Sequence, residues 1–307
     1  MGKTVSAYTL QIFVMQGIWG IFMALLQHAV AVAREYLWGF PMLALLFGTH
    51  LYFTFHLGFI QKKIPLGIRL SLTGTKNQEN DQVTPYSALA TALAATIGTG
   101  NIVGISTAIA IGGPGAVFWM WVTALIGSST AFIEATLAQL YKEKDPLYGG
   151  YRGGPAYYMH RYMERRQKKK KRYSLIAVLF AISGLICWCG ISQVISNSVT
   201  SSLENAFSVP PLYTTIVLVA LAAVIVLRKN ATVKVLDLLV PVMAVCYFVL
   251  TIVIIFRNIG SLPQVFERIF QEAFGFRQIA AGGFGAVLMN GIKRGLFSNE
   301  AGSGSAP

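Results

Sequence analysis

A cluster of glycine, threonine and asparagine interrupts an otherwise apolar stretch of this chain, at Gly98-Thr99-Gly100-Asn101. Glycine loosens a helix, and Thr and Asn side chains compete for its backbone hydrogen bonds. Within a bilayer, unwound backbone persists only where protein or a wet cavity satisfies its polar groups. Freed amides at such a break suit an anionic group and freed carbonyls suit a cation, so these residues predict a ligand site inside a membrane.

A second apolar run, opening near Ile279, contains the same kind of interruption. Glycines and Phe284 occupy residues 282–285, and Asn290-Gly291 is predicted to break the helix again. Glycine breaks at corresponding places in two halves of a chain indicate a transporter binding site. The two runs are predicted to cross the membrane in opposite directions, as an inverted repeat requires.

Two other interpretations of the first break stay open. Gly100 and Gly104 are four residues apart, a spacing that also serves close packing of a second helix. The glycine spacing superficially matches a dinucleotide-binding loop, but no strand precedes it and it lies inside an apolar run.

Spanning helices must position these breaks. The chain has 307 residues, of which 54% are hydrophobic and 12% charged, and its mean hydropathy is +0.58. This composition excludes a soluble globule and a disordered chain. A spanning helix needs about 20 apolar residues. The predicted spans are 8–33, 37–60, 86–111, 116–140, 173–199, 213–227, 238–256 and the run from 279 onward.

The net charge of +13 is a topology signal. Eight of the 25 cations lie in residues 161–172, between two apolar runs, which excludes a nucleic-acid-binding surface spread over a folded domain. Along strictly alternating loops, twenty cations fall on one side and four on the other. The asymmetry predicts a multi-pass protein of the plasma membrane with its basic loops in the cytoplasm.

Three segments have a less certain relation to the bilayer. The run 8–33 ends in Ala31-Val32-Ala33, so it is either a signal peptide or an extra spanning helix. Residues 153–166 and 263–274 are predicted to be interfacial helices. The cluster Arg161–Arg172 is predicted to anchor the topology in contact with anionic lipid.

Few other residues have the character of reactive or ligating groups. Glu134 is the one carboxylate inside a predicted span. It serves either an ion or proton path, or a structural pair with Lys142 or a loop amide. Asn299-Glu300 is either a polar helix end or a cytoplasmic gate. The cysteines are predicted to be buried apolar packing residues; they are Cys187, Cys189 and Cys246. The histidines lack the spacing of metal ligands; they are His28, His50, His56 and His160.

Three segments resemble the sodium:alanine (alanine or glycine:cation) symporter family. They are residues 98–104, residues 112–122, and the long string 295–307, Gly-Leu-Phe-Ser-Asn-Glu-Ala-Gly-Ser-Gly-Ser-Ala-Pro. The resemblance runs from about Leu37 to the last residue. It implies an all-α polytopic membrane protein with a leucine-transporter-like inverted-repeat fold, truncated after the first helix of the second repeat.

The resemblance also implies an organisation of the chain. Residues 1–36 would be an N-terminal apolar extension that the family usually lacks, and 37–85 the first family helix with a cytoplasmic loop. Residues 86–278 would form the first five-helix repeat, and 279–307 the first helix of an incomplete second repeat. Because family members continue for several more spans, we expect that this polypeptide alone does not transport.

The implied activity is Na+-coupled symport of a small neutral amino acid, alanine or glycine, by alternating access, and not an enzymatic reaction. In such a site the amides of Thr99 and Gly100 meet the substrate carboxylate. The implied substrate-binding residues are Thr96, Thr99, Gly100, Asn101, Gln193, Ile195, Gly282, Gly283 and Phe284. The implied Na+ ligands are the backbone carbonyls of Ala94 and Ile97.

One departure from the family concerns the substrate pocket. The family leads us to expect a glutamine near Ile195, and Gln193 is the candidate substitute. Two alternative functions stay open: an H+-coupled carrier of the same kind, or a membrane-embedded scaffold or enzyme whose glycines only pack helices. The oligomeric state does not follow from the sequence.

Overall fold

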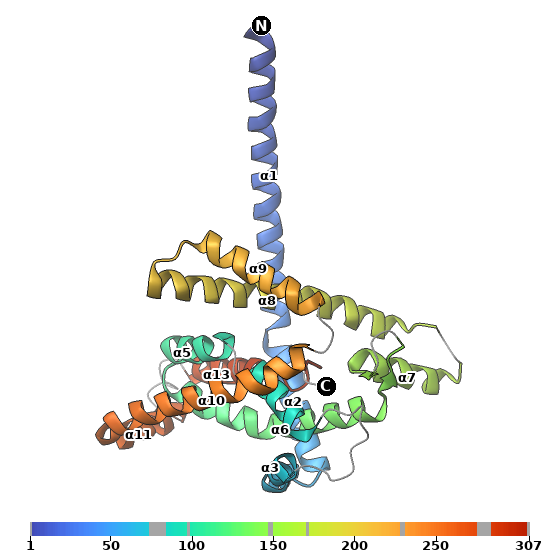
Figure 1. Ribbon diagram of the computed structural model, residues 1–307, viewed down its shortest axis with the longest axis vertical. Coiled ribbons are helices and arrows are strands. Elements are labelled where there is room, and N and C mark those ends of the chain that lie inside the picture. Colours follow the sequence, from blue (N-terminus) through green and yellow to red (C-terminus); the bar gives the residue numbers. More distant parts are fainter. Residues whose placement is uncertain are drawn as a thin grey trace. The chain divides into compact units, whose positions relative to one another are not determined.

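The computed structural model describes residues 2–73, 84–96, 99–146, 150–169, 172–227, 231–274 and 284–305. Helices dominate this part of the chain (Figure 1). An apolar chain favours helices in a bilayer because each helix satisfies its own backbone hydrogen bonds. By internal contacts the chain divides into two units, Met1–Gly48 and Thr49–Pro307.

The first unit contains α1 (Gly2–Leu37) and the beginning of α2 (Phe40–His56). The predicted run 8–33 lies entirely within α1, whose end is closed by a hydrogen bond from the Trp38 amide to the Arg34 carbonyl, 2.8 Å. A Cβ atom on Gly39 would lie 2.8 Å from the Glu35 carbonyl oxygen, so the turn into α2 requires glycine. Whether this run is a signal peptide or an extra spanning helix stays a prediction.

The second unit contains the rest of α2 and all later elements. Its first part holds η1 (Ile60–Lys63), α3 (Ile64–Thr73), α4 (Pro85–Thr96), α5 (Thr99–Gly112), α6 (Gly115–Leu140), and the antiparallel strands β1 (Glu143–Lys144) and β2 (Tyr151–Arg152). Its second part holds α7 (Pro155–Gln167), α8 (Leu175–Phe207), α9 (Pro211–Leu227), α10 (Ala231–Arg257), η2 (Ile259–Ser261), α11 (Leu262–Ala273) and α13 (Phe284–Asn299).

Three stretches of the described chain are long and apolar enough to cross a membrane: Gly20–His56, Gly115–Leu140 and Leu175–Phe207. A fourth is present if Pro241–Arg257 and Ile259–Ala273, bent by 73°, form one span. The prediction of a helical polytopic membrane protein is therefore confirmed at this level for the residues that the structure describes. The remaining predicted spans contain shorter helices, such as α4, α5 and α9.

Helix α6 is the element on which the site is built, because α5, α11 and α13 all pack against it. Ala116 and Thr123 of α6 are completely buried. The indole Nε1 of Trp119 donates a hydrogen bond to the carbonyl of Ala273 in α11, 3.2 Å. Phe118 stacks edge-on against Phe270 and Phe274, so one aromatic cluster fixes the predicted amphipathic helix α11 to the start of α6.

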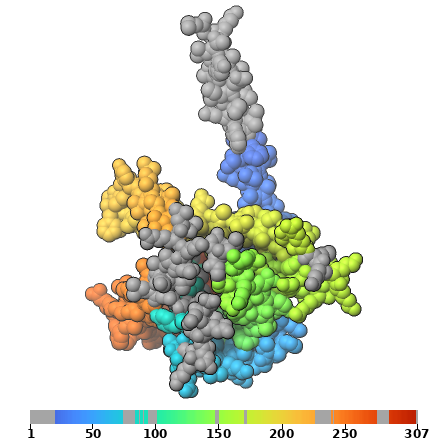
Figure 2. Space-filling view, turned by 45° about the vertical axis from the view of Figure 1, so that its right-hand side comes forward, coloured from blue at the N-terminus to red at the C-terminus, as the bar shows by residue number. Residues whose placement is uncertain are grey.

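Apolar side chains also cover much of the outer surface of the second unit. Helix α9, yellow-orange in Figure 2, has exposed residues such as Tyr213, Val217 and Leu221. The three cysteines are free and exposed, so the prediction that they are buried packing residues was wrong. A helix that faces lipid is apolar even where no protein covers it. Hydropathy alone therefore does not distinguish a lipid-facing residue from one that is buried in the protein.

Candidate functional site

The first predicted break lies between two helices, α4 and α5. Ala94 and Thr96 belong to the last turns of α4, and Thr99, Gly100 and Asn101 to the first turn of α5. Ile97 lies outside the described residues. The backbone amides at the start of a helix lack intrahelical partners, so the first turn of α5 presents donors at the place where the sequence predicts an anion site.

The second glycine-bearing segment, α13, packs against α5 and α6. Phe284 is the first residue of α13, whereas Gly282 and Gly283 lie outside the described residues. A Cβ atom on Gly112 in α5 would lie 3.1 Å from the Cβ of Asn290 in α13. The structure therefore brings together the two segments that the sequence singles out, although they are separated by most of the chain.

Helix α13 is continuous through Asn290 and Gly291, so the prediction that these two residues break the helix was wrong. A Cβ atom on Gly291 would lie 2.6 Å from the Trp119 Cβ and 2.7 Å from the Ala116 carbonyl oxygen. Gly295, one turn later, would place a Cβ 2.7 Å from the Cβ of Thr123. These two glycines allow α13 to approach the backbone of α6, and close packing explains them.

Gly104 in α5 serves a different contact. A Cβ atom there would overlap the guanidinium of Arg294 from α13. That guanidinium also lies 4.8 Å from the ring centroid of Phe297, in cation–π geometry. Gly104 thus makes room for a charged side chain on the backbone of α5, rather than for a second helix backbone.

Gln193 and Ile195 both lie on α8, which contacts α5. Gln193 lines a hollow of about 610 Å³ between α8 and α9, while the side chain of Ile195 is exposed. Residues of α8 at helical spacing give the hollow a polar wall: Gln193, Ser196, Asn197 and Thr200. A polar stripe inside an apolar helix 33 residues long is a candidate for contact with a polar ligand.

At the far end of α6, Glu134 is buried and accepts two backbone hydrogen bonds. The Gly302 amide donates to Oε2 over 3.0 Å and the Gly304 amide donates to Oε1 over 3.1 Å. Of the structural alternatives for Glu134, the loop amide is therefore correct. Lys142 instead donates to Gln139 and lies over the ring of Tyr151.

Asn299 ends α13 and its side chain crosses to α6. Its Nδ2 donates to the Thr123 carbonyl over 3.4 Å, and it occupies the space beside Gly127 that a side chain there would need. The polar end of α13 is therefore joined to α6 by a side chain as well as by the turn that follows.

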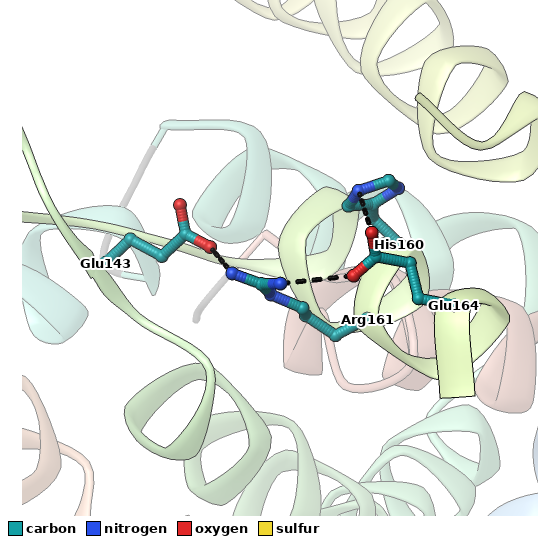
Figure 3. Close-up of polar contacts among 4 residues, drawn as sticks. All are labelled: Glu143, His160, Arg161 and Glu164. Atoms are coloured by element: carbon teal, nitrogen blue, oxygen red, sulfur yellow. Dashed lines mark hydrogen bonds and ion pairs between the residues drawn. The ribbon is translucent and has the colours of Figure 1, made fainter. Parts of the chain in front are cut away.

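The basic segment after α6 is organised by ion pairs (Figure 3). The guanidinium of Arg161 in α7 lies 2.6 Å from Glu143 in β1 and 3.1 Å from Glu164, which also contacts His160 at 3.6 Å. Hydrogen bonds from Arg161 to Glu143, then to Glu164, raise the pKa of Arg161. Because Arg161 is exposed and its carboxylate partners are only partly buried, the ion pairs contribute little stability but hold the hairpin beside α7.

The profile of the sodium:alanine symporter family matches residues 23–307. A probable sodium/glutamine symporter, GlnT of Bacillus subtilis, is 42% identical over 92% of this chain and 58% of its own length. The sodium/alanine symporter AgcS of Methanococcus maripaludis is 40% identical, over 91% of this chain and 61% of its own.

The chain belongs to the sodium:alanine symporter family. A putative sodium/proton-dependent alanine carrier of Bacillus subtilis, YrbD, is also similar, with 39% identity over 91% of this chain and 56% of its own length. The relatives are transporters and not enzymes, which excludes the enzyme alternative. The chain spans about three-fifths of the length of these relatives.

The family match begins at residue 23, inside the run predicted to be an extension that the family lacks. Residues 23–36 therefore lie inside the region that the family profile matches, and the division of the chain at residue 36 stays a prediction. Residues before 23 lie outside the match.

Sequence reasoning missed a buried polar network between α2 and α6 of this family member. His50 is completely buried and its Nδ1 lies 2.7 Å from the Thr130 hydroxyl. Thr54 bonds to Ser129 at 2.9 Å, and Gln61 donates to both the Ser129 hydroxyl and the Leu125 carbonyl at 2.9 Å.

Two polar atoms of this network lack a hydrogen-bond partner, His50 Nε2 and Gln61 Oε1. The available signal was His50 at four residues from Thr54, on one face of an apolar run. A polar pair on one face of a spanning helix predicts a polar partner helix, but not which helix supplies it.

Proposed function

We propose that the protein is a Na+-coupled symporter of a small neutral amino acid, alanine or glycine, working by alternating access in the bacterial plasma membrane. Membership of a family of amino-acid and sodium transporters supports this function. The observation that carries it is the contact of α5 with α13, because these are the glycine-bearing segments that would open the two inverted repeats.

The substrate carboxylate would bind at the first turn of α5. The amides of Thr99 and Gly100 belong to the N-terminus of α5, where the partial positive charge of the helix dipole favours an anion. Backbone crowding by Gly282 and Gly283, with Phe284 as an aromatic wall, would leave volume only for a small side chain. Thr96 and Asn101 would complete this side of the pocket.

The sodium ion is a substrate of the transport cycle. The carbonyl oxygens of Ala94 and Ile97 would contribute to its site, because a hard cation prefers oxygen ligands. The name of the Bacillus subtilis relative YrbD includes both sodium and proton. The experiment must therefore distinguish coupling to Na+ from coupling to H+.

The second open choice is the substrate side chain. The Bacillus subtilis relative GlnT is named for glutamine. Gln193 and Asn197 border the hollow on α8, and their amides suit a substrate with a polar side chain. Ile195, near which the family leads us to expect a glutamine, would give an apolar contact suited to alanine.

The basic loops would face the cytoplasm, as the cation asymmetry predicts. Exposed cations of α7 and the turn after it include Arg165, Arg166 and Lys168. These would contact anionic lipid at the membrane surface, each contributing about 1 kcal/mol.

Because residues 1–307 alone are not expected to transport, the function is tested with the complete symporter chain reconstituted in liposomes, by uptake and equilibrium binding of labelled alanine, glycine and glutamine. We expect binding and uptake that require Na+ and are not supported by an equal K+ gradient. Accumulation driven by a pH gradient without Na+ would assign the coupling to H+. Absence of both binding and uptake under either gradient would overturn the carrier function, and a preference for glutamine would overturn the proposed substrate.

A further inference from the structure

The turn that follows α13 has an unusual backbone. Glu300, Gly302 and Gly304 adopt the left-handed conformation, with φ angles of 55°, 86° and 74°. Alternation of such residues turns successive amides toward one side, which forms a concave anion-binding nest. The turn comprises residues 300–305, within the family-specific string 295–307, and it belongs to neither the proposed substrate site nor the proposed sodium site.

The anion in this nest belongs to the protein itself. Each oxygen of the Glu134 carboxylate accepts one amide of the turn, at 3.0 and 3.1 Å, although Glu134 precedes the turn by about 170 residues. Glu134 is only 8% exposed. A buried carboxylate is costly unless hydrogen bonds satisfy it, and two charge-assisted bonds from a preformed turn meet that need.

The rest of the turn is also docked. Ala301 is buried, and a Cβ atom on Gly304 would lie 2.5 Å from Pro155 at the start of α7 and 3.0 Å from Phe180 in α8. Internal bonds close the loop, because Ser305 Oγ donates to the Glu300 carboxylate over 2.6 Å and Ser303 donates to the Glu300 carbonyl. The turn therefore rests against α6, α7 and α8 together.

We infer that Glu134 is a positioning residue: its carboxylate holds the 300–305 turn in place and thereby fixes the end of α13 against α6. The docking of the turn does not depend on the transport function. The effect of this docking on transport rests on the proposed function. If the end of α13 is loosened, α13 no longer keeps a fixed position against α5 during the transport cycle. Glu134 does not contact the proposed substrate site, so it acts on turnover and not on substrate affinity.

Amide hydrogen exchange of the peptide containing 300–305, measured on the full chain in lipid nanodiscs, tests the docking. Glu134→Gln is isosteric, but its NH₂ group cannot accept the second amide, so exchange should accelerate about tenfold. Glu134→Ala removes both acceptors and should accelerate it further. Glu143→Gln is the matched control, since that carboxylate pairs with Arg161 and does not contact the turn, and its exchange should equal that of the unchanged protein.

Unchanged exchange in Glu134→Gln and Glu134→Ala would overturn the inference, whatever the transport result. Acceleration throughout the chain, rather than in the turn, would indicate general unfolding and also count against it. In uptake assays of the complete symporter chain, Glu134→Gln should lower the maximal rate several-fold with little change in KM. A raised KM at an unchanged maximal rate would overturn the positioning role. Failure of the unchanged protein to bind or transport any amino acid would instead refute the proposed function. The hydrogen-exchange result would still decide whether Glu134 holds the 300–305 turn.

Discussion

The guanidinium of Arg294 in α13 occupies the space that a side chain on Gly104 in α5 would need. The arginine then lies between the α5 backbone and the ring of Phe297. Arg294 is half-buried, and a cation removed from water requires compensating polar or aromatic neighbours. The absence of a side chain at Gly104 is therefore needed for the position of the Arg294 charge.

Gly104→Ala should destabilise the protein by about 1–3 kcal/mol, because the new methyl group displaces the guanidinium from its place on α5. Thermal unfolding in detergent micelles measures the loss as a lower Tm. Arg294→Ala should reduce the penalty of Gly104→Ala, since the clash disappears; strict additivity in this double-mutant cycle would contradict the contact. Gly184→Ala in α8 is the control, because nothing lies within 4 Å of that position.

Gly291→Ala should also lower the stability, by about 1–3 kcal/mol, since the methyl group would meet the Ala116 carbonyl of α6. Gly285→Ala lies on the same helix with open space around it, and it should be neutral or stabilising by about 0.5–1 kcal/mol. Equal unfolding midpoints for the two variants would show that α13 does not pack on α6 through Gly291.

Thr130→Val should cost about 1–3 kcal/mol, because it leaves Nδ1 of the fully buried His50 without its 2.7 Å partner. Chemical or thermal unfolding of the reconstituted protein gives the difference. Thr136→Val removes the same hydroxyl from an exposed position on α6, where it bonds only the Phe132 carbonyl of its own helix. Comparable losses in both variants would rule out a special role for the His50 network.

Tyr158 in α7 provides a pH-dependent readout of Glu134. Burial, and then the negative charge of Glu134, raise the pKa of Tyr158 to about 12. A raised pKa in the folded state favours the protonated phenol, so this contribution to stability is present below pH 10 and is lost between about pH 10 and 12.

Ultraviolet difference titration against Tyr158→Phe isolates this phenol from the other tyrosines. In Glu134→Gln the midpoint should move to lower pH, because the charge is removed while burial remains. Glu143→Gln is the matched control and should leave the midpoint unchanged. A midpoint that does not move in Glu134→Gln would contradict the proximity of the two side chains.

Gly100→Leu should weaken Na+-dependent alanine binding by at least about tenfold, which corresponds to 1.4 kcal/mol. The side chain would fill the proposed carboxylate site at the first turn of α5. Gly190→Leu, on an open part of α8, should leave binding unchanged. Unaltered affinity in Gly100→Leu, measured in reconstituted membranes, would remove the proposed substrate site from this helix.

Much of the helical framework follows from local sequence alone. The uncharged runs predict α6 and α8, and the pattern of 263–274 predicts the amphipathic helix α11, because burial and backbone satisfaction in a bilayer depend mainly on residues near in sequence. The string 295–307 likewise identifies the family before any contact is known.

What the sequence by itself determined is thus the membrane class, the helices and the family of this protein. Only the tertiary structure decided what individual residues do: Gly291 packs, Gly104 accommodates Arg294, His50 bonds to Thr130, and Glu134 binds the turn after α13. These partners lie 80 to 190 residues apart along the chain. Helical periodicity specifies which face of a helix is polar or small, but the partner is set by packing between distant segments, which a local pattern does not encode.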